Sequence, residues 1–561
     1  MPTWVVIVIA LAIYVAVYVL YGRKVARDVV KVDPTRQTPA HRFYDGVDYV
    51  PGKWPVVFGH HFASIAGAAP IVGPIIALAW GWLPCILWVW LGNAFIGAVH
   101  DFLALMASVR YDGKSIQWTS GEVMRPRVSF IFSIFVYLTL ILVVAAFANV
   151  LAGIFIATPP VATASLLFIA VAVLIGYLIY WKKLNLTAMS VLGVALMIAA
   201  IAGSFQIPLA LTKNIWMVIF FVYIVVAAAL PVTILLQPRD YLNAYLLIAF
   251  LVLGGIAFLG VQASMTWPAF TSFSATVIGG QPSPFWPAVP LVIACGALSG
   301  FHALVGSGTT SKMLDSEAHA LKIGYGGMLT EGFLSTLVIV AVGAFGLSVA
   351  GVTASAVGAA GWKALGIPVF SQSYAIGVNA VFGISVAFGA VFASLTVAAF
   401  VLTTLDTTNR LARFAWGDIL TRGVRSEEAR KKPVFRFFTN NWVASVIPAG
   451  LGIYLATVSG VFSALWAAFG GANQMLAAIA LITSSVWAVN VMRAGRACLV
   501  ALIPAFFLWV TVAAAYIWYL FTMAGIVNPL TLVIMGIMLI LSFYLLYEFI
   551  RALRKGPAKT A

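Results

Sequence analysis

The sequence predicts an all-α, polytopic membrane protein with about fifteen transmembrane helices, and two observations lead to this prediction. Of its 561 residues, 63% are hydrophobic and only 9% are charged, whereas soluble domains carry about 25% charged residues. So few charges cannot cover a surface that faces water. The apolar residues also fall in runs long enough to cross about 30 Å of hydrocarbon. The chain is therefore expected to have the lipid bilayer as its surroundings.

The apolar runs give the expected order of the helices. Residues 4–21 form the first run, with no positive charge before it and Arg23 and Lys24 directly after it. This is the reverse of a cleaved signal peptide, so we expect a retained helix with its N-terminus outside. The other expected spans are 55–80, 83–109, 129–157, 161–181, 185–209, 215–236, 241–263, 287–310, 327–350, 373–408, 439–458, 461–491, 497–521 and 527–550.

The basic residues support this order. With the N-terminus outside, every Lys and Arg among the 32 falls in an inner loop, Arg239 included, except Lys213 and Lys363. Cytoplasmic loops collect Lys and Arg, so the net charge of +16 indicates orientation and not a nucleic-acid partner. The C-terminus is then cytoplasmic. The uncharged segment 264–286 lies outside, either packed on the protein, re-entrant, or as a plain extracellular loop.

Three cysteines lie in the apolar runs: Cys85, Cys295 and Cys498. Their spacing indicates neither a disulfide framework nor a zinc site made of cysteines. We expect them to be small residues of the core.

Polar and ionisable side chains within the spans are candidate functional residues, because they are costly in lipid. The second span contains His60, His61 and Ser64, flanked by Gly59, Gly67 and Pro70. These glycines and the proline weaken the helix, and a broken helix at membrane depth is tolerated where it lines a cavity. A kinked packing helix is the alternative.

The third span contains His100 and Asp101. An imidazole beside a carboxylate is a natural site for a proton. A buried pair that joins two helices explains these residues equally well.

The ninth span ends in a segment rich in glycine and hydroxyl groups, with His302, Ser307, Thr309 and Thr310. Its hydroxyl oxygens could bind a cation or a carboxylate. A soluble phosphate-binding loop is excluded by the membrane setting.

Glu331 and Asp406 are further acids within or at the edge of spans. Asp406 lies near the inner interface, where it could instead be a helix-end residue paired with Arg410. Asn473 and Gln474 follow Gly470 and Gly471. This predicts either a local break in that helix or close packing of small residues.

Secondary transporters often contain two five-helix repeats of opposite orientation, each starting with an unwound helix at the substrate site. The predicted spans fit this plan, with Pro231 as the helix-breaking residue of the seventh span. The expected organisation is a first helix and cytoplasmic loop (1–54), a first inverted repeat (55–209), a second inverted repeat (215–410), a basic cytoplasmic loop (411–438), and four additional helices with a tail (439–561).

This arrangement predicts a central site where the second and ninth spans meet. The residues expected to bind substrate are His60, His61, Ser64, Pro231, His302 and Ser307. The residues expected to couple transport to an ion are His100, Asp101, Thr309, Thr310, Glu331 and Asp406.

Four motifs identify a family. Residues 42–46 (RFYDG), 58–67 (FGHHFASIAG), 112–115 (DGKS) and 236–243 (LQPRDYLN) resemble the carbon starvation protein A family, over roughly residues 20–480. The resemblance implies a prokaryotic inner-membrane carrier, induced in starving cells, that imports peptides or, in some members, pyruvate with protons. It also implies kinship with the amino acid-polyamine-organocation transporters and their LeuT-type 5+5 inverted-repeat core.

The function expected is proton-coupled import of peptides, without a cofactor and without enzymatic activity. A pyruvate and proton symporter is the alternative, and sodium coupling stays open. A membrane metal-binding protein or metalloenzyme is the alternative of another class, with His60, His61, His100 and Asp101 as ligands for zinc or iron. No motif with two histidines four residues apart supports it.

Overall fold

The computed structural model describes residues 1–46, 48–230, 236–360, 366–423, 431–458 and 460–555. In these ranges almost all regular structure is helical, and twelve helices are long and apolar enough to cross a membrane. They cover Thr3–Val30, Trp82–Arg110, Pro126–Ala157, Pro159–Ile179, Thr187–Ser204, Arg239–Gly260, Glu317–Ala350, Val386–Thr421, Asn441–Val458, Phe462–Asn490, Gly495–Thr522 and Pro529–Arg554. If the bent pair of helices Trp54–Ile65 and Ala69–Trp80 is counted as one further span, the number of candidate spans is thirteen.

The expectation of about fifteen spans is therefore too high. The expected span 215–236 is α12 (Lys213–Ala229), which is apolar but short. The expected span 287–310 is divided into two short helices, α14 (Phe285–Val292) and α15 (Gly300–Gly308). Apolar composition alone does not reveal where a helix unwinds, because both segments remain hydrophobic throughout.

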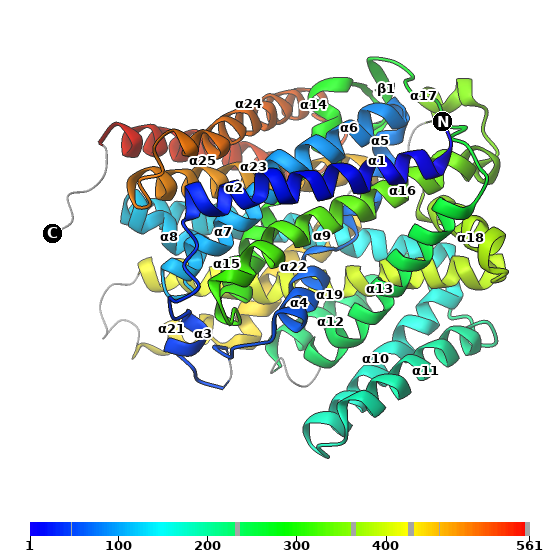
Figure 1. The fold of residues 1–561 in the computed structure, drawn as a ribbon, viewed down its shortest axis with the longest axis horizontal. Helices are drawn as coiled ribbons and strands as arrows, with labels where there is room; N and C mark the ends of the chain where they lie inside the picture. Colours follow the sequence, from blue (N-terminus) through cyan, green and yellow to red (C-terminus); the bar gives the residue numbers. More distant parts are fainter. Residues whose placement is uncertain (47, 231–235, 361–365, 424–430, 459, 556–561) are drawn as a thin grey trace.

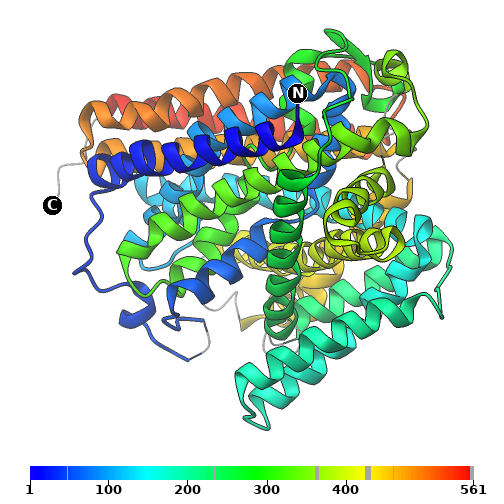
Figure 2. The ribbon, with the colours of Figure 1, turned by 45° about the vertical axis from the view of Figure 1, so that its right-hand side comes forward.

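Helix α1 (Thr3–Ala16) lies beside α16 (Gly326–Ala350), and both run along the long axis of the molecule (Figure 1). The core is built around α9 (Pro126–Ala157), α19 (Val386–Gly423) and α23 (Phe462–Asn490), which pack on one another or on shared neighbours. The hairpin of α10 (Pro159–Tyr180) and α11 (Leu186–Ser204) lies at one edge (Figure 2).

Further helices complete the bundle. They are α6 (Trp82–Gly92), α7 (Ala98–Arg110), α8 (Ile116–Val123), α13 (Leu236–Gly260), α18 (Ile367–Phe382), α22 (Asn441–Val458), α24 (Leu499–Thr522) and α25 (Pro529–Lys555). Helix α2 (Arg23–Val25) continues the first span, Thr3–Val30. Short helices α3 (Pro39–Arg42), α17 (Val357–Ala360) and α21 (Pro433–Phe438) lie in or beside the connections.

The connections with most charge meet at one end of the bundle. Ion pairs join them there: Arg110 with Glu317 at 2.7 Å, Arg42 with Asp112 at 2.7 Å and His41 with Asp315 at 2.8 Å. The pair Arg42 and Asp112 joins two of the motifs that identify the family. We call this end of the bundle, with its three ion pairs, the charged end.

The predicted basic loop 411–438 is shorter than expected. Helix α19 continues through the basic residues as far as Gly423, and α21 follows at Pro433–Phe438. Residues 424–430, together with Pro231 and Lys363, lie outside the described residues.

The uncharged segment 264–286 packs on the opposite end of the bundle. It contains an antiparallel hairpin of β1 (Ser274–Thr276) and β2 (Pro282–Pro284), with Ser274 opposite Pro284. Trp267 donates its indole N–H to the carbonyl of Leu78 at 2.9 Å. The expectation of a loop packed on the protein is confirmed.

Two interrupted helices run antiparallel through the middle of the bundle. The first consists of α4 (Trp54–Ile65) and α5 (Ala69–Ala77), which meet at a bend of 46°. It begins at the charged end, where Gly52 donates to the carbonyl of Met313 at 3.0 Å. The second, α14 with α15, begins at the opposite end, where Phe285 donates to the carbonyl of Phe273 at 2.7 Å.

The two interruptions lie side by side. Helix α4 contacts α15, and α5 contacts α14. Gly73 on α5 permits this approach, because a Cβ there would lie 2.7 Å from the carbonyl oxygen of Val292. The unwound link 293–299 therefore faces the break at 66–68.

Candidate functional site

Side chains from α23 hold the carbonyl groups of the unwound link. Asn473 donates to the carbonyl of Ala294 at 2.6 Å and to the hydroxyl of Ser299 at 2.9 Å. It also accepts the N–H of Phe301 at 2.9 Å. Gln474 donates to the carbonyls of Pro290 and Ile293. Unpaired backbone carbonyls are costly at membrane depth, so these amides stabilise the break.

The local break expected at Asn473 and Gln474 is absent, because α23 is continuous from Phe462 to Asn490. The alternative of close packing is confirmed. A Cβ at Gly470 would lie 2.1 Å from the carbonyl oxygen of Leu291, so only glycine allows α23 to approach the last turn of α14 so closely. The two amides belong to an intact helix, and they hydrogen-bond to the backbone at the break between α14 and α15.

The link leaves several donors without partners. In the described part of the chain, the N–H groups of Ala294, Cys295, Ala297 and Leu298 donate to no backbone or side-chain acceptor. The carbonyl of Gly296, by contrast, accepts from Asn93 at 2.7 Å. The link therefore offers hydrogen-bond donors more than acceptors, which suits an anionic group.

A small cavity lies between the two interruptions. It is mostly apolar and has room for no more than about one water molecule. Its lining combines both breaks with α9, α19 and α23: Ile65, Gly67, Ala69, Val143, Phe147, Cys295, Ser299, Phe301, Thr404, Phe469 and Asn473. We call it the central cavity.

A chain of histidines and acids lies beside this cavity. The imidazole Nδ1 of His100 lies 2.7 Å from one oxygen of Asp101, and Nδ1 of His302 lies 2.8 Å from the other. On its far side, Nε2 of His302 lies 3.3 Å from a carboxylate oxygen of Glu331. All four side chains are buried, and they join α7, α15 and α16. We call them the acid–histidine chain.

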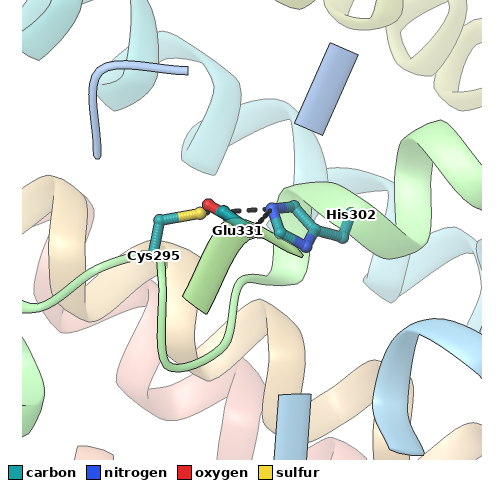
Figure 3. Close-up of side chains that lie close together, drawn as sticks. All are labelled: Cys295, His302 and Glu331. Atoms are coloured by element: carbon teal, nitrogen blue, oxygen red, sulfur yellow. Dashed lines mark hydrogen bonds and ion pairs between the residues drawn. The ribbon is translucent and has the colours of Figure 1, made fainter. Parts of the chain in front are cut away.

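Cys295 brings a thiol to the same place. Its Sγ lies 3.1 Å from Nε2 of His302 (Figure 3). Among the described residues, the converging set of three His, Cys, Asp or Glu donors is Cys295, His302 and Glu331. This differs from the set expected under the metal-binding alternative, which consisted of His60, His61, His100 and Asp101. The thiol was expected to be only a core residue.

The predicted meeting of the second and ninth spans is confirmed at one contact. Nδ1 of His61 lies 2.8 Å from the hydroxyl oxygen of Thr310, and both side chains are buried. His60 is only partly buried. Ser64 donates to the carbonyl of His60 at 2.8 Å, within its own helix.

Ser307 and Thr309 do not join this contact. Ser307 accepts the N–H of Ile116 at the start of α8, at 3.0 Å, and donates to the carbonyl of Ala303. Thr309 donates to the carbonyl of Val305 at 2.9 Å. The assignment of these two residues to substrate or ion stays a prediction, but their hydroxyls already have partners.

A second buried ion pair corrects two expectations. Arg239 does not lie in an inner loop: its side chain is fully buried and contacts Asp406, with Nη1 to Oδ2 at 2.5 Å and Nη2 to Oδ1 at 3.2 Å. Tyr223 and Asp240 also hydrogen-bond within this group. Asp406 therefore pairs with Arg239 and not with Arg410, whose guanidinium donates to the carbonyls of Ala227 and Leu230.

Sequence reasoning missed Arg239, Cys295, Asn93 and the role of Asn473. One available signal was the sequence Arg239-Asp240 at the start of an apolar run, since a charged pair there can fold inward as well as face a loop. The sequence does not single out Cys295 as a functional residue, because a lone cysteine in an apolar run is usually a core residue.

Comparison with known proteins gives the family. The sequence matches the family described as carbon starvation protein CstA over residues 2–361 and 348–515. It is 34% identical to the peptide transporter CstA of Escherichia coli, over 89% of this chain and 78% of that protein. The peptide transporter CstA of Bacillus subtilis is 32% identical, over 97% and 96%.

The pyruvate/proton symporter BtsT of Escherichia coli is 30% identical, over 92% of this chain and 80% of that protein. Among solved structures, a manganese transporter from Eremococcus coleocola matches 91% of this chain and 99% of its own, with 13% identity and a TM-score of 0.31. The relatives are bacterial transporters and not enzymes. The family match covers most of the chain, so this multi-pass membrane protein belongs to the carbon starvation protein CstA family.

Proposed function

We propose that this protein is a proton-coupled importer of short peptides in the bacterial inner membrane, with pyruvate as the alternative substrate. Relatives named as peptide transporters support the first substrate, and a relative named as a pyruvate/proton symporter supports the second and the coupling ion. Peptides and pyruvate share one chemical group, the carboxylate.

The observation that carries the proposal is the pair of antiparallel interrupted helices around the central cavity. Free N–H groups at 294, 295, 297 and 298 and the N-terminus of α15 would bind the substrate carboxylate. Ser299 and Asn473 add polar groups to a lining that is otherwise mostly apolar. The contacting pair His61 and Thr310 lies between this cavity and the charged end.

The central cavity is too small for a substrate in this structure, because it has room for only about one water molecule. Transport therefore requires the interrupted helices to move apart. We infer an inverted-repeat core in which α4–α5 and α14–α15 are the first helices of the two repeats. With this pairing the second repeat starts near residue 285, at the beginning of α14, whereas the sequence predicts its start at 215.

The acid–histidine chain is the proposed proton site. A protonated His302 can donate to Asp101 and Glu331 together, whereas a neutral imidazole can donate to only one of them. A proton therefore stabilises both carboxylates at once. Sodium coupling stays the alternative, because the hydroxyl of Thr309 donates to the carbonyl of Val305 and keeps oxygen lone pairs that could bind a cation.

Uptake by proteoliposomes tests the proposal. An inward proton gradient should accelerate accumulation of labelled substrate, and replacing sodium by choline should not change it. Competition by unlabelled di- and tripeptides against pyruvate identifies the substrate. If accumulation of the substrate does not depend on the proton gradient, the protein is not proton-coupled.

A Glu331→Gln variant separates coupling from binding. The variant lacks one of the two carboxylates that a proton on His302 would stabilise. The proton gradient should therefore no longer accelerate net uptake. Exchange of labelled for unlabelled substrate should continue. Glu122→Gln is the control, because Glu122 is exposed on α8. Equal gradient stimulation in both variants would remove Glu331 from the proton site.

We place the charged end in the cytoplasm, with the N-terminus outside. The basic connections gather there, as expected of cytoplasmic loops. A fluorescent protein fused to the C-terminus should fluoresce, and alkaline phosphatase fused there should be inactive. The opposite pair of results would reverse the orientation.

A further inference from the structure

We propose that Cys295, His302 and Glu331 form a binding site for a divalent cation of the zinc class. The three donor atoms lie within 4.8 Å of one another, and each side chain is buried (Figure 3). They come from three different segments: the unwound link, α15 and α16. The binding of the cation does not depend on the proposed transport function.

The distances are close to those that a tetrahedral ion needs. Zn–S bonds of about 2.3 Å and Zn–N or Zn–O bonds of about 2.0–2.1 Å place the donors about 3.5 Å (S to N) and about 3.3 Å (N to O) apart. The observed separations are 3.1 Å from Sγ to Nε2 and 3.3 Å from Nε2 to the carboxylate oxygen. The separation of Sγ from Nε2 has to grow by about 0.4 Å, and the thiol lies on the non-helical link.

His302 is oriented as a metal-binding histidine usually is. Its Nδ1 faces Asp101 at 2.8 Å, which directs Nε2 toward Cys295 and Glu331. Asp101 is itself held by His100 at 2.7 Å. A carboxylate behind a ligating imidazole fixes its tautomer and strengthens its binding.

Glu331 faces the other two donors from its own helix. It is completely buried, and its carboxylate contacts Nε2 of His302 at 3.3 Å, the thiol of Cys295 and the N–H of Gly296. Buried carboxylates are normally paired, hydrogen-bonded or bound to a metal. A cation between Glu331 and Cys295 would pair with this carboxylate.

The fourth ligand of such an ion would be a water molecule on the side of the central cavity. Cys295 lines that cavity, which has room for about one water. Three protein ligands and a water are the usual set of an open zinc site. Sulfur and imidazole donors favour zinc over magnesium or calcium.

Equilibrium binding tests the site without any transport. The full-length protein, purified with a tag that contains no histidines and freed of metal, is titrated with Zn²⁺ against a chromophoric chelator. We expect one zinc per protein, with one sulfur at about 2.3 Å in the X-ray absorption spectrum. Absence of stoichiometric zinc, or a bound zinc without sulfur, would overturn the proposal.

Variants assign the ligands. Cys295→Ser should weaken zinc binding by at least about tenfold and remove the sulfur signal. The control is Cys85→Ser, because Cys85 on α6 is equally buried but its thiol donates to the carbonyl of Gly81, just before that helix. Unchanged affinity in Cys295→Ser refutes the site. If that variant does not fold, Glu331→Gln and the wild-type absorption spectrum decide.

Discussion

Replacing Asn473 by leucine removes the side chain that holds the unwound link to α23. The wild-type amide accepts the N–H of Phe301 and donates to the carbonyl of Ala294, at 2.9 and 2.6 Å. Leucine has a similar size but no polar atoms. Both backbone groups are then left without their partner, in a region that is almost completely buried.

The magnitude follows from these two groups. Each buried backbone group without a partner costs about 1–3 kcal/mol, so Asn473→Leu should lower the free energy of unfolding by about 2–6 kcal/mol. The control is Asn490→Leu on the same helix, where one bond of 3.3 Å to the carbonyl of Ala552 is lost. It should cost no more than about 1 kcal/mol.

Unfolding of the detergent-purified variants, followed by circular dichroism during titration with denaturing detergent, measures the differences. Substrate uptake by proteoliposomes gives the functional readout, and it should fall in the same order as stability. An Asn473→Leu protein as stable as Asn490→Leu would refute the reasoning. It would show that the link holds its shape without the amide.

Three further predictions concern other parts of the bundle. Arg239→Met should destabilise the protein by about 3–5 kcal/mol, because it leaves Asp406 buried without its cation, and the double variant with Asp406→Leu should recover part of this loss on denaturation. Gly73→Ala should cost about 1–3 kcal/mol by overpacking, since its Cβ would lie 2.7 Å from a carbonyl oxygen, whereas Gly153→Ala, with nothing within 4 Å, should not destabilise. His61→Ala should abolish uptake in liposomes while the amount of protein in the membrane fraction stays the same; full activity would remove His61 from the site.

The sequence alone predicts the membrane class and most helix positions, because span length and apolar composition follow directly from the bilayer. It also predicts the sorting of the basic connections to one end. It predicts poorly where a helix is interrupted. The link 293–299 is as apolar as a helix, and its unwinding depends on Asn473, Gln474 and Asn93, which lie far away in the sequence.

The candidate site shows the same division. The sequence identifies Asp101, His302 and Glu331 one by one as candidate functional residues, since an ionisable residue within a membrane span usually has a function. Their assembly into one chain depends on how α7, α15 and α16 pack. Arg239 was assigned to a loop because the rule for cytoplasmic loops counts charges and does not see that Asp406 can pair with one of them inside the bundle.

The position of His302 links the proposed substrate and proton sites mechanically. It lies in the first turn of α15, directly after the link that lines the central cavity. Its two nitrogens face acids on different helices, Asp101 on α7 and Glu331 on α16. A movement of α15 that widens the cavity therefore changes at least one of these distances, unless all three helices move together. A carboxylate that loses its imidazolium at this depth must take up a proton or another partner, because an unpaired buried charge is too costly. Opening the cavity and transferring the proton are then two consequences of one displacement.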